Sequence, residues 1–306
     1  MNPKKKKKNK KKILFFRIAA AAFTILFGVS TVMLVRELRQ TKKETDTFSE
    51  LSAMRLPRGD SHGLTTQPIE DSEVETIMIV INERGETTYV TENTTEPANT
   101  EETTGEEQTE SGQERKPLQT YSALHEKNRD FFGWITVPDT KVDYPVMFSP
   151  DRPLQYLGHD FFGSASYHGV PFLDAECDPN GNFYLVYGHH MEDGTMFAGL
   201  VEYDKKSFWE NHPTFRFDTL YEERTYAVVI AMRGRVLNVD EEGFRYYNYT
   251  SLDTEAEFMN YIRQAKQLAR YDTGVDVSFG DELLVLSTCY HYTSNGRFVV
   301  IAKRIG

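Results

Sequence analysis

Apolar residues form one long run near the start of the chain and many short runs towards its end. The long run covers residues 13–35, where Arg17 is the only charged side chain. It is long enough to cross a bilayer as a single helix. Short runs rich in β-branched and aromatic residues dominate only after residue 118, with turn-forming residues between them. The pattern therefore predicts a membrane-spanning helix and, further along, a folded domain rich in strands.

The short runs of residues 118–306 predict a mainly β domain. The predicted strands are residues 134–137, 142–148, 183–187, 225–232, 283–289 and 297–303. Helices are predicted at residues 121–132 and 252–271, the second with a capping box from Thr254 to Glu257. Its apolar residues at helical spacing are Phe258, Ile262, Ala265 and Ala269. Many short strands favour a β-barrel or sandwich, with one helix inserted before the last two strands.

Residues 36–117 lack the apolar side chains needed to build a core. Residues 86–114 contain nine glutamates and no lysine or arginine, a composition typical of a solvated chain. The segment is therefore predicted to be a Thr/Glu-rich linker that is mostly disordered. Residues 76–90 alternate between apolar and polar positions and could form a hairpin. Because an isolated hairpin is marginal in water, we expect order there only if it docks on the domain.

The charges around the long apolar run predict its orientation. Eight lysines and Arg17 lie within the first 17 residues. The positive-inside rule keeps such a flank in the cytoplasm, so residues 1–12 form a cytoplasmic tail and the domain lies outside the cell. A cleaved signal peptide is the alternative, but it would have a shorter apolar core and a small-residue cleavage site. Arg36, Glu37 and Arg39 follow the run instead, which favours an uncleaved anchor.

Net charge narrows the choice of partners. The chain carries −11 in total, and the first 17 residues contribute +9, so the remainder carries −20. An exported part that is this acidic argues against nucleic acid as a partner. The lysine run suits an anionic inner leaflet and acts as a topology signal.

Cys289 and Arg297 are candidates for chemistry because of their places on the last two predicted strands. Cys289 ends one strand and Arg297 opens the next, so a hairpin would bring the guanidinium level with the thiol. A cysteine attacks as its thiolate and needs a partly exposed, electropositive setting. A guanidinium offers five N–H donors for a developing oxyanion or a substrate carbonyl. The loop at residues 290–296 joins the two residues, and Tyr290 or Tyr292 is expected to touch substrate there.

His189 is the candidate general acid and base. It follows an apolar β-type run and Gly188, just as Cys289 ends such a run. A histidine near its ordinary pKa can protonate a leaving amine and accept a proton from an incoming nucleophile. Four other histidines lie in loops or turns without this setting: His159, His168, His212 and His291.

Two other interpretations of the same residues remain open. Cys177 and Cys289 are the only cysteines, and two cysteines in an exported domain could form a disulfide. Cys177, however, lies in a loop rich in turn formers. A zinc site at His189, His190 and Cys289 would lack the paired ligand spacing and the fourth ligand of a structural site.

Several motifs together resemble class B sortases, membrane-anchored cysteine transpeptidases of Gram-positive bacteria. These are LSTC at 286–289 with GRFVV at 296–300, YGHHM at 187–191, and supporting matches at 127–147, 155–163 and 170–174. The resemblance covers residues 118–306 and implies a closed β-barrel with peripheral helices. It maps the family's nucleophile, histidine and arginine onto Cys289, His189 and Arg297. Val285 and His190 depart from the family pattern, where threonine and asparagine are common.

The resemblance also implies a reaction. Cys289 would attack a carbonyl in the C-terminal sorting motif of a secreted protein, and a thioacyl intermediate would form. An amine of a peptidoglycan precursor or of a pilin would then resolve it. Thr288 or a backbone N–H beside Cys289 would supply a second oxyanion donor. Class B relatives imply no cofactor and no metal.

Three alternatives lead to different functions. A cysteine protease of the same architecture would hydrolyse the thioester with water. L,D-transpeptidases also join cysteine, histidine and arginine on a β-rich exported domain, but their histidine-glycine and glycine-cysteine signatures are absent here. A non-catalytic surface module would need no reactive thiol at Cys289.

Overall fold

The structure is a computed structural model that describes residues 3–55, 78–81, 87–90 and 115–306. Side chains are described throughout the last range, for residues 42–55, and for part of residues 23–39. The chain divides into two units, one of residues Met1–Pro57 with Lys116–Gly306 and one of residues Arg58–Arg115. The first unit contains the folded domain and its N-terminal helix.

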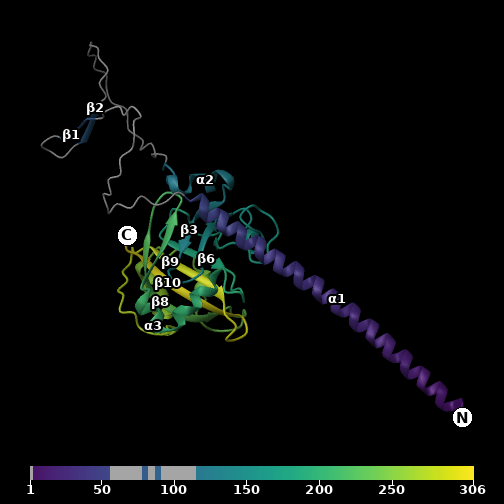
Figure 1. The fold of residues 1–306 in the computed structure, drawn as a ribbon. Helices are drawn as coiled ribbons and strands as arrows, with labels where there is room; N and C mark the ends of the chain where they lie inside the picture. Colours follow the sequence, from purple (N-terminus) through teal and green to yellow (C-terminus); the bar gives the residue numbers. More distant parts are fainter. Residues whose placement is uncertain (1–2, 56–77, 82–86, 91–114) are drawn as a thin grey trace. The chain divides into compact units, whose positions relative to one another are not determined.

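Eight strands of the first unit close into a barrel in the order β10-β8-β7-β3-β4-β5-β6-β9 (Figure 1). The strands are β3 (Phe131–Thr136), β4 (Asp143–Met147), β5 (Phe172–Leu173), β6 (Phe183–Gly188), β7 (Thr214–Thr219), β8 (Thr225–Arg235), β9 (Leu283–Cys289) and β10 (Gly296–Arg304). The β4–β5 and β6–β9 pairs are parallel, and the other neighbours are antiparallel. Closure pairs both edges of every strand and so removes exposed sheet edges. The predicted closed β-barrel is therefore confirmed.

Helices surround the barrel. They are α1 (Pro3–Met54), α2 (Gln119–Lys127), η1 (Gln155–Leu157), η2 (Phe197–Asp204), α3 (Lys206–Asn211), η3 (Tyr246–Asn248) and α4 (Glu255–Gln267). α4 is the predicted inserted helix, and its N-cap is Thr254, whose hydroxyl accepts from the Glu257 N–H at 3.2 Å. The predicted Phe258, Ile262 and Ala265 are buried on one face together with Tyr261. The predicted helix is wrong at its C-terminal end, because Ala269 lies beyond α4 and forms a β-bridge with Met232.

The strand β9 is buried along almost its whole length. Residues 283–288 are buried without alternation, because one face of the strand points into the barrel core and the other is covered. Ser287 shows the covering, since its hydroxyl lies 2.8 Å from the hydroxyl of buried Tyr246 in η3. Cys289 is the first residue of this strand that is partly exposed.

The predicted helix at residues 121–132 is wrong at its C-terminal end. α2 stops at Lys127 because Asn128 takes an extended conformation and its side chain makes tertiary hydrogen bonds. Its amide donates to the Tyr156 hydroxyl at 2.8 Å and to the Phe161 carbonyl at 2.6 Å. β3 then begins at Phe131.

Two barrel strands, β5 and β7, escaped the prediction. β5 has only two residues and is defined by its neighbours. β7 buries Phe215 and Phe217, but the charged residues Arg216 and Asp218 beside them weaken its apolar pattern.

The N-terminal helix α1 extends through residues 36–54, the first part of the predicted linker. Its end packs on the barrel unit, where Leu51 is fully buried and the Phe48 ring meets Tyr144 edge-on at 5.0 Å. No helix among the described residues is long and apolar enough to span a membrane. The anchor at residues 13–35 stays a prediction, and the side chains of residues 13–22 lie outside the described residues.

The second unit contains the predicted hairpin strands. β1 (Met78–Ile81) and β2 (Thr87–Val90) pair antiparallel, from Met78 opposite Val90 to Ile81 opposite Thr87. The rest of the predicted disordered linker, at residues 56–77, 82–86 and 91–114, lies outside the described residues.

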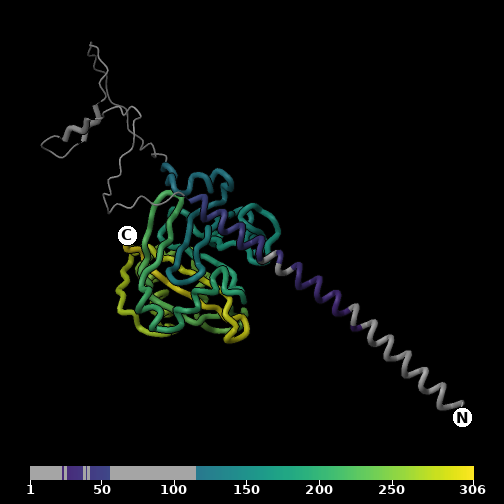
Figure 2. Tube along the Cα trace, viewed as in Figure 1, coloured from purple at the N-terminus to yellow at the C-terminus, as the bar shows by residue number. Residues whose placement is uncertain are grey.

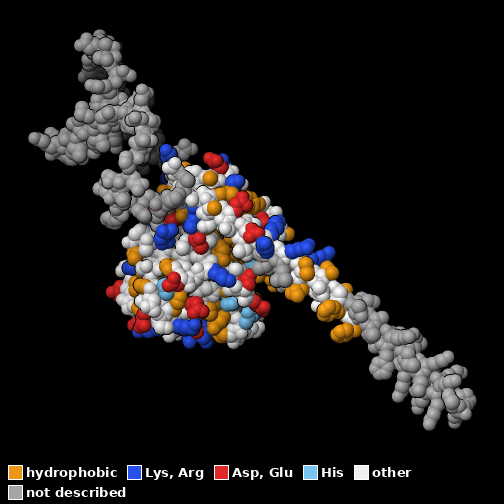
Figure 3. Space-filling view, in the orientation of Figure 1, with side chains coloured by type: hydrophobic (Ala, Val, Ile, Leu, Met, Phe, Trp, Pro, Cys, Tyr) orange, Lys and Arg blue, Asp and Glu red, His pale blue; other side chains and the backbone are white. Residues whose placement is uncertain are grey.

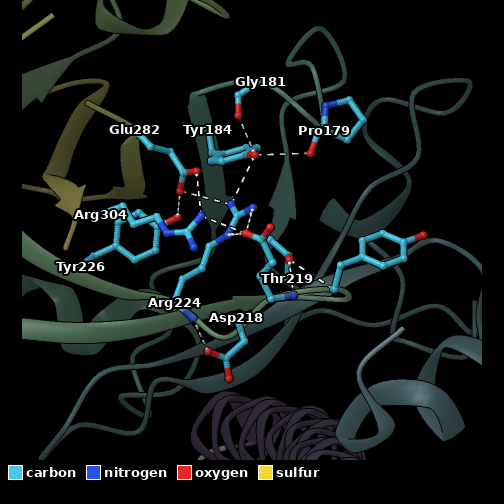
Figure 4. A network of polar contacts seen from close by, with 11 residues as sticks. Pro179, Gly181, Tyr184, Asp218, Thr219, Arg224, Tyr226, Glu282 and Arg304 are labelled. Carbon is cyan, nitrogen blue, oxygen red and sulfur yellow. Dashed lines mark hydrogen bonds and ion pairs between the residues drawn. The ribbon is translucent and has the colours of Figure 1, made fainter. Parts of the chain in front are cut away.

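A buried ionic network closes the barrel end at which β6 and β9 begin (Figure 4). The Arg224 side chain is 6% exposed and donates to Glu222 at 2.9 Å and to Glu282 at 3.1 Å. The Tyr226 hydroxyl donates to the Glu282 carboxylate, and Arg304 lies 3.5 Å from the same carboxylate. Glu282 therefore balances the charge of two arginines and accepts a hydrogen bond from a tyrosine. Burial alone would raise the pKa of Glu222, but hydrogen bonds from Arg224 and Arg304 lower it.

Removing the charge of Glu282 should destabilise the barrel. We expect Glu282→Gln to lower the free energy of unfolding by about 2–4 kcal/mol, because it leaves buried Arg224 without one of its carboxylates. The adjacent Asp281→Asn is the matched control. Asp281 pairs with Lys303 at 3.2 Å, and the Lys303 side chain is more exposed than that of Arg224. The loss of stability in Asp281→Asn should therefore stay below about 1 kcal/mol. Urea denaturation of both variants measures the difference, and equal losses would contradict a special role for the network.

Candidate active site

The three predicted catalytic residues lie at the ends of β6, β9 and β10: His189 follows β6, Cys289 ends β9 and Arg297 is the second residue of β10. β6 and β10 are the two neighbours of β9 in the barrel (Figure 1). The parallel register of β6 and β9 pairs Gly188 with Thr288. His189 and Cys289 are the next residues, so both follow paired positions at the same end. The predicted hairpin is also confirmed, because the β9–β10 register places Arg297 directly opposite Cys289.

Gly188 ends β6 and lets the backbone pass close to the core just before His189. A Cβ atom at this position would lie 2.6 Å from two ring carbons of Phe197. Phe197 is fully buried at the start of η2, so its ring has no room to move. The close approach of backbone and ring therefore requires glycine immediately before the histidine.

The His189 ring has a defined tautomer. Its Nε2 lies 2.8 Å from the carbonyl oxygen of Leu157 in η1. Since a carbonyl oxygen can only accept, Nε2 carries the hydrogen, and in the neutral ring Nδ1 keeps its lone pair. This arrangement leaves Nδ1 available to take a proton and to give it back.

His190 has a different environment from its neighbour. Its ring stacks on Tyr290 with 6.4 Å between centroids and 26° between planes. Burial, followed by the nearby His291, lowers the pKa of His190 and favours its neutral form. The choice of His189 over His190 as the catalytic histidine stays a prediction.

Arg297 has donors to spare for a substrate. Its recorded hydrogen bonds among the described residues run from one nitrogen, Nη1, to the carbonyls of Asn295 at 3.3 Å and Gly296 at 3.0 Å. A guanidinium has five N–H groups, so most remain available to a carbonyl oxygen. These two backbone contacts hold the side chain near its own strand end, level with Cys289.

The three residues predicted to bind substrate lie around this strand end. Tyr290 is partly buried between His190 and Phe298. Tyr292 is 41% exposed, and its hydroxyl donates to the Gly234 carbonyl at 2.7 Å, which ties the loop to β8. Thr288 is 2% exposed, and its hydroxyl is buried without a hydrogen bond among the described residues. Their contacts with substrate stay predictions.

The two cysteines are not joined, so the disulfide interpretation is wrong. Both thiols are free, with Cys177 buried and Cys289 partly exposed. Burial raises the pKa of Cys177 to about 12, which keeps it protonated. In the described part of the chain, no group of three or more His, Cys, Asp or Glu side chains is placed to hold a metal ion.

Comparisons with known proteins agree with this arrangement. The family model described as Sortase domain matches residues 135–305, more than half of the chain. Sortase B of Listeria monocytogenes is 34% identical over 192 residues, which cover 60% of this chain and 72% of that protein. Sortase B of Staphylococcus aureus is 30% identical over 190 residues, which cover 60% and 74%.

This chain is a sortase. Its relatives place it in class B, the family of cysteine transpeptidases whose motifs match those around Cys289. A solved structure described as a Staphylococcus aureus sortase B-substrate complex superposes with a TM-score of 0.55 at 28% identity. It covers 62% of this chain, and the match covers 86% of that structure.

Sequence reasoning missed two contacts around the site of this sortase. The partner of His189 is a backbone carbonyl of Leu157, and such a contact has no sequence signature. His168 was set aside as a loop histidine, yet it is 6% exposed and lies between two carboxylates. The apolar spacing of residues 44–55 could have revealed the docked face of α1.

The two thiols should differ sharply in reactivity. We expect iodoacetamide at pH 8 to alkylate Cys289 faster than Cys177 by about tenfold or more. Only a thiolate reacts with iodoacetamide, and burial keeps Cys177 protonated. Mass spectrometry of the folded chain measures both rates. Labelling in urea is the control, since unfolding should make the rates similar. Equal rates in the folded state would contradict the inert role of Cys177.

Gly188→Ala tests the approach of Phe197 to the histidine turn. The added methyl should move β6 or Phe197 and lower the free energy of unfolding by about 1–3 kcal/mol. It should also lower the acylation rate more than the unfolded fraction explains, because His189 is the next residue. Gly158→Ala is the control, since a Cβ there meets nothing within 4 Å. Equal behaviour of the two variants would contradict this explanation.

Proposed function

We propose that this sortase joins secreted proteins to a surface amine outside the cell. The expected substrate is a C-terminal sorting motif of the NPxTx or PxTG type. The acceptor is an amine of a peptidoglycan precursor or of a pilin. The single observation that carries the proposal is the strand register that aligns Cys289 with Arg297 and with the end of β6. The Staphylococcus aureus relative was solved as a complex with a substrate, which supports substrate binding by the same barrel in this chain.

The first half-reaction breaks the peptide bond. The Cys289 thiolate attacks the carbonyl carbon, and Arg297 donates hydrogen bonds to the oxygen as negative charge develops. The carbon–nitrogen bond then breaks. His189 carries the proton released by the Cys289 thiol and gives it to the leaving amine, and the acyl group remains on sulfur as a thioester.

The second half-reaction transfers the acyl group. The acceptor amine attacks the thioester carbon while His189 takes up the proton of the amine. The carbon–sulfur bond breaks, and the new amide leaves with the thiolate restored. Thr288 or a backbone N–H beside Cys289 supplies a second oxyanion donor in this proposal.

The N-terminal segment gives the reaction its place. In the proposal, residues 13–35 anchor the chain in the membrane with residues 1–12 in the cytoplasm. The sortase domain then stays near translocating substrates and lipid-linked acceptors, which raises their effective concentration.

On the face shown in Figure 3, acidic and basic side chains of the barrel are interspersed.

The proposal can be tested with the full-length chain in detergent micelles and a panel of sorting-motif peptides. We expect an acyl adduct on Cys289 by mass spectrometry and a new amide when an amine is added. Cys289→Ala should abolish the adduct. Arg297→Lys and His189→Gln should slow its formation about 10²–10³-fold.

His212→Gln is the matched histidine control, because the His212 ring pairs with Asp139 and with the Phe208 carbonyl, not with a proposed catalytic residue. It should acylate at the wild-type rate. A product that is the free acid at every amine concentration would show a protease instead. The absence of any adduct across the peptide panel would overturn the proposed substrate class.

A further inference from the structure

The end of α1 presents one continuous face to the barrel. Glu44, Phe48 and Leu51 recur at spacings of four and three residues, which places them on the same side of the helix, and Arg55 follows directly after its end. Glu44 and Leu51 are buried, and Phe48 is half-buried. The Arg55 guanidinium lies 4.3 Å from the Trp134 ring centroid and 3.3 Å from the Asp143 carboxylate. The end of α1 is therefore a docked element and not a simple tether (Figure 2).

A first connection runs from α1 to the loop after the catalytic histidine. Glu44 contacts Nδ1 of His168, whose side chain is 7% exposed. Nε2 of the same ring lies 3.1 Å from the Asp193 carboxylate. Asp193 belongs to residues 190–196, which we call the histidine loop. A buried imidazole thus bridges the helix and this loop.

Asp193 sets the conformation of the histidine loop. Its Oδ1 accepts from the Thr195 N–H at 2.9 Å and from the Thr195 hydroxyl at 2.6 Å, while its backbone carbonyl accepts from Lys141 at 2.7 Å. Burial would raise the pKa of Asp193, but hydrogen bonds from Thr195 and His168 lower it and keep it ionised. The His168 ring therefore lies between two carboxylates, one from α1 and one from the histidine loop.

A second connection reaches the other end of the histidine loop. Phe48 of α1 packs edge-on against the Tyr144 ring at 5.0 Å. The Tyr144 hydroxyl accepts a hydrogen bond from the Met196 N–H at 3.2 Å. Met196 is a buried, non-glycine residue with a φ of 53°, a conformation that needs support from its surroundings.

The histidine loop closes directly on His189. The Phe197 N–H donates to the His189 carbonyl at 2.8 Å, and His190 forms a bridge with Met196. A shift at Asp193 or Met196 would therefore move the backbone of His189. Small displacements of a catalytic group are costly, because reaction depends on alignment within fractions of an ångström.

We propose that Glu44 and Phe48 are positioning residues for His189, acting through His168 and Tyr144 on the two ends of the histidine loop. Docking of the N-terminal helix then sets the rate of the sortase reaction. This inference rests on the proposed function only for its kinetic readout. The mechanical link from α1 to the loop stands on the contacts alone.

The kinetic test compares two alanine variants on one helix in the full-length chain in detergent micelles. Glu44→Ala should lower kcat for acylation of Cys289 about threefold to tenfold with KM nearly unchanged, because alignment and not binding is lost. Glu50→Ala is the matched control, since Glu50 is exposed on the same helix. Glu44→Gln should restore part of the rate, because its amide oxygen still accepts from His168. Rates are expressed per folded molecule.

A double-mutant cycle tests the route. If Glu44 acts through His168, the double variant Glu44→Ala with His168→Gln should be no slower than His168→Gln alone. Phe48→Ala should add to the effect of Glu44→Ala, because it acts on the other end of the loop. Fully additive losses for Glu44 and His168 would overturn the relay.

Hydrogen exchange tests the link without any donor peptide. We expect Glu44→Ala to speed exchange of the Thr195, Met196 and Phe197 amides at least threefold, roughly, as the loop opens locally more often. Glu50→Ala should leave them unchanged. Unchanged exchange in Glu44→Ala, or faster exchange with a wild-type kcat, would overturn the inference. If the wild-type chain forms no acyl adduct on Cys289, the proposed function is contradicted. Hydrogen exchange would still decide whether α1 is coupled to the histidine loop.

Discussion

The parallel register between β6 and β9 joins segments a hundred positions apart, with Gly188 opposite Thr288. Parallel strands end on the same side of a sheet, so the residues that follow them share one edge of the barrel. The β9–β10 hairpin then returns Arg297 to Cys289. A slip of one residue would turn every side chain of a strand to its opposite face. Because the barrel is closed, neighbouring strands oppose such a slip from both sides, and the site inherits that rigidity.

The two ends of the barrel serve different purposes. At the end where β6 and β9 begin, Arg224 and its neighbours satisfy one another in a buried ionic network (Figure 4). At the opposite end, the His190 ring and the Thr288 hydroxyl keep buried polar atoms without hydrogen bonds among the described residues. Met196 and Asn295 also hold positive φ values there. Unsatisfied groups and strained backbone are typical of sites whose geometry serves function.

The N-terminal helix belongs to this architecture because its end packs on the barrel unit. Phe48 of α1 packs on Tyr144 of β4, and the buried His168 lies between Glu44 of α1 and Asp193 in the loop that follows His189. In the proposed arrangement, with residues 13–35 as a membrane anchor, this packing would restrict the orientations that the domain can take beside the membrane. A sortase with this arrangement can therefore combine high local concentration of substrate with a defined presentation of its site.

The sequence by itself determined the class of domain, the last hairpin, the capped helix α4 and the residues that meet at the strand ends. Each of these has a local signature: alternating or continuous apolar runs, Thr254 as an N-cap, or a glycine that admits the Phe197 ring. Tertiary structure alone decided where α2 stops, because Asn128 bonds to residues beyond the helix. It also decided the tautomer of His189 and the bridging role of His168. Their partners are a backbone carbonyl and carboxylates from separate elements, and contacts over such sequence distances leave no pattern in the chain.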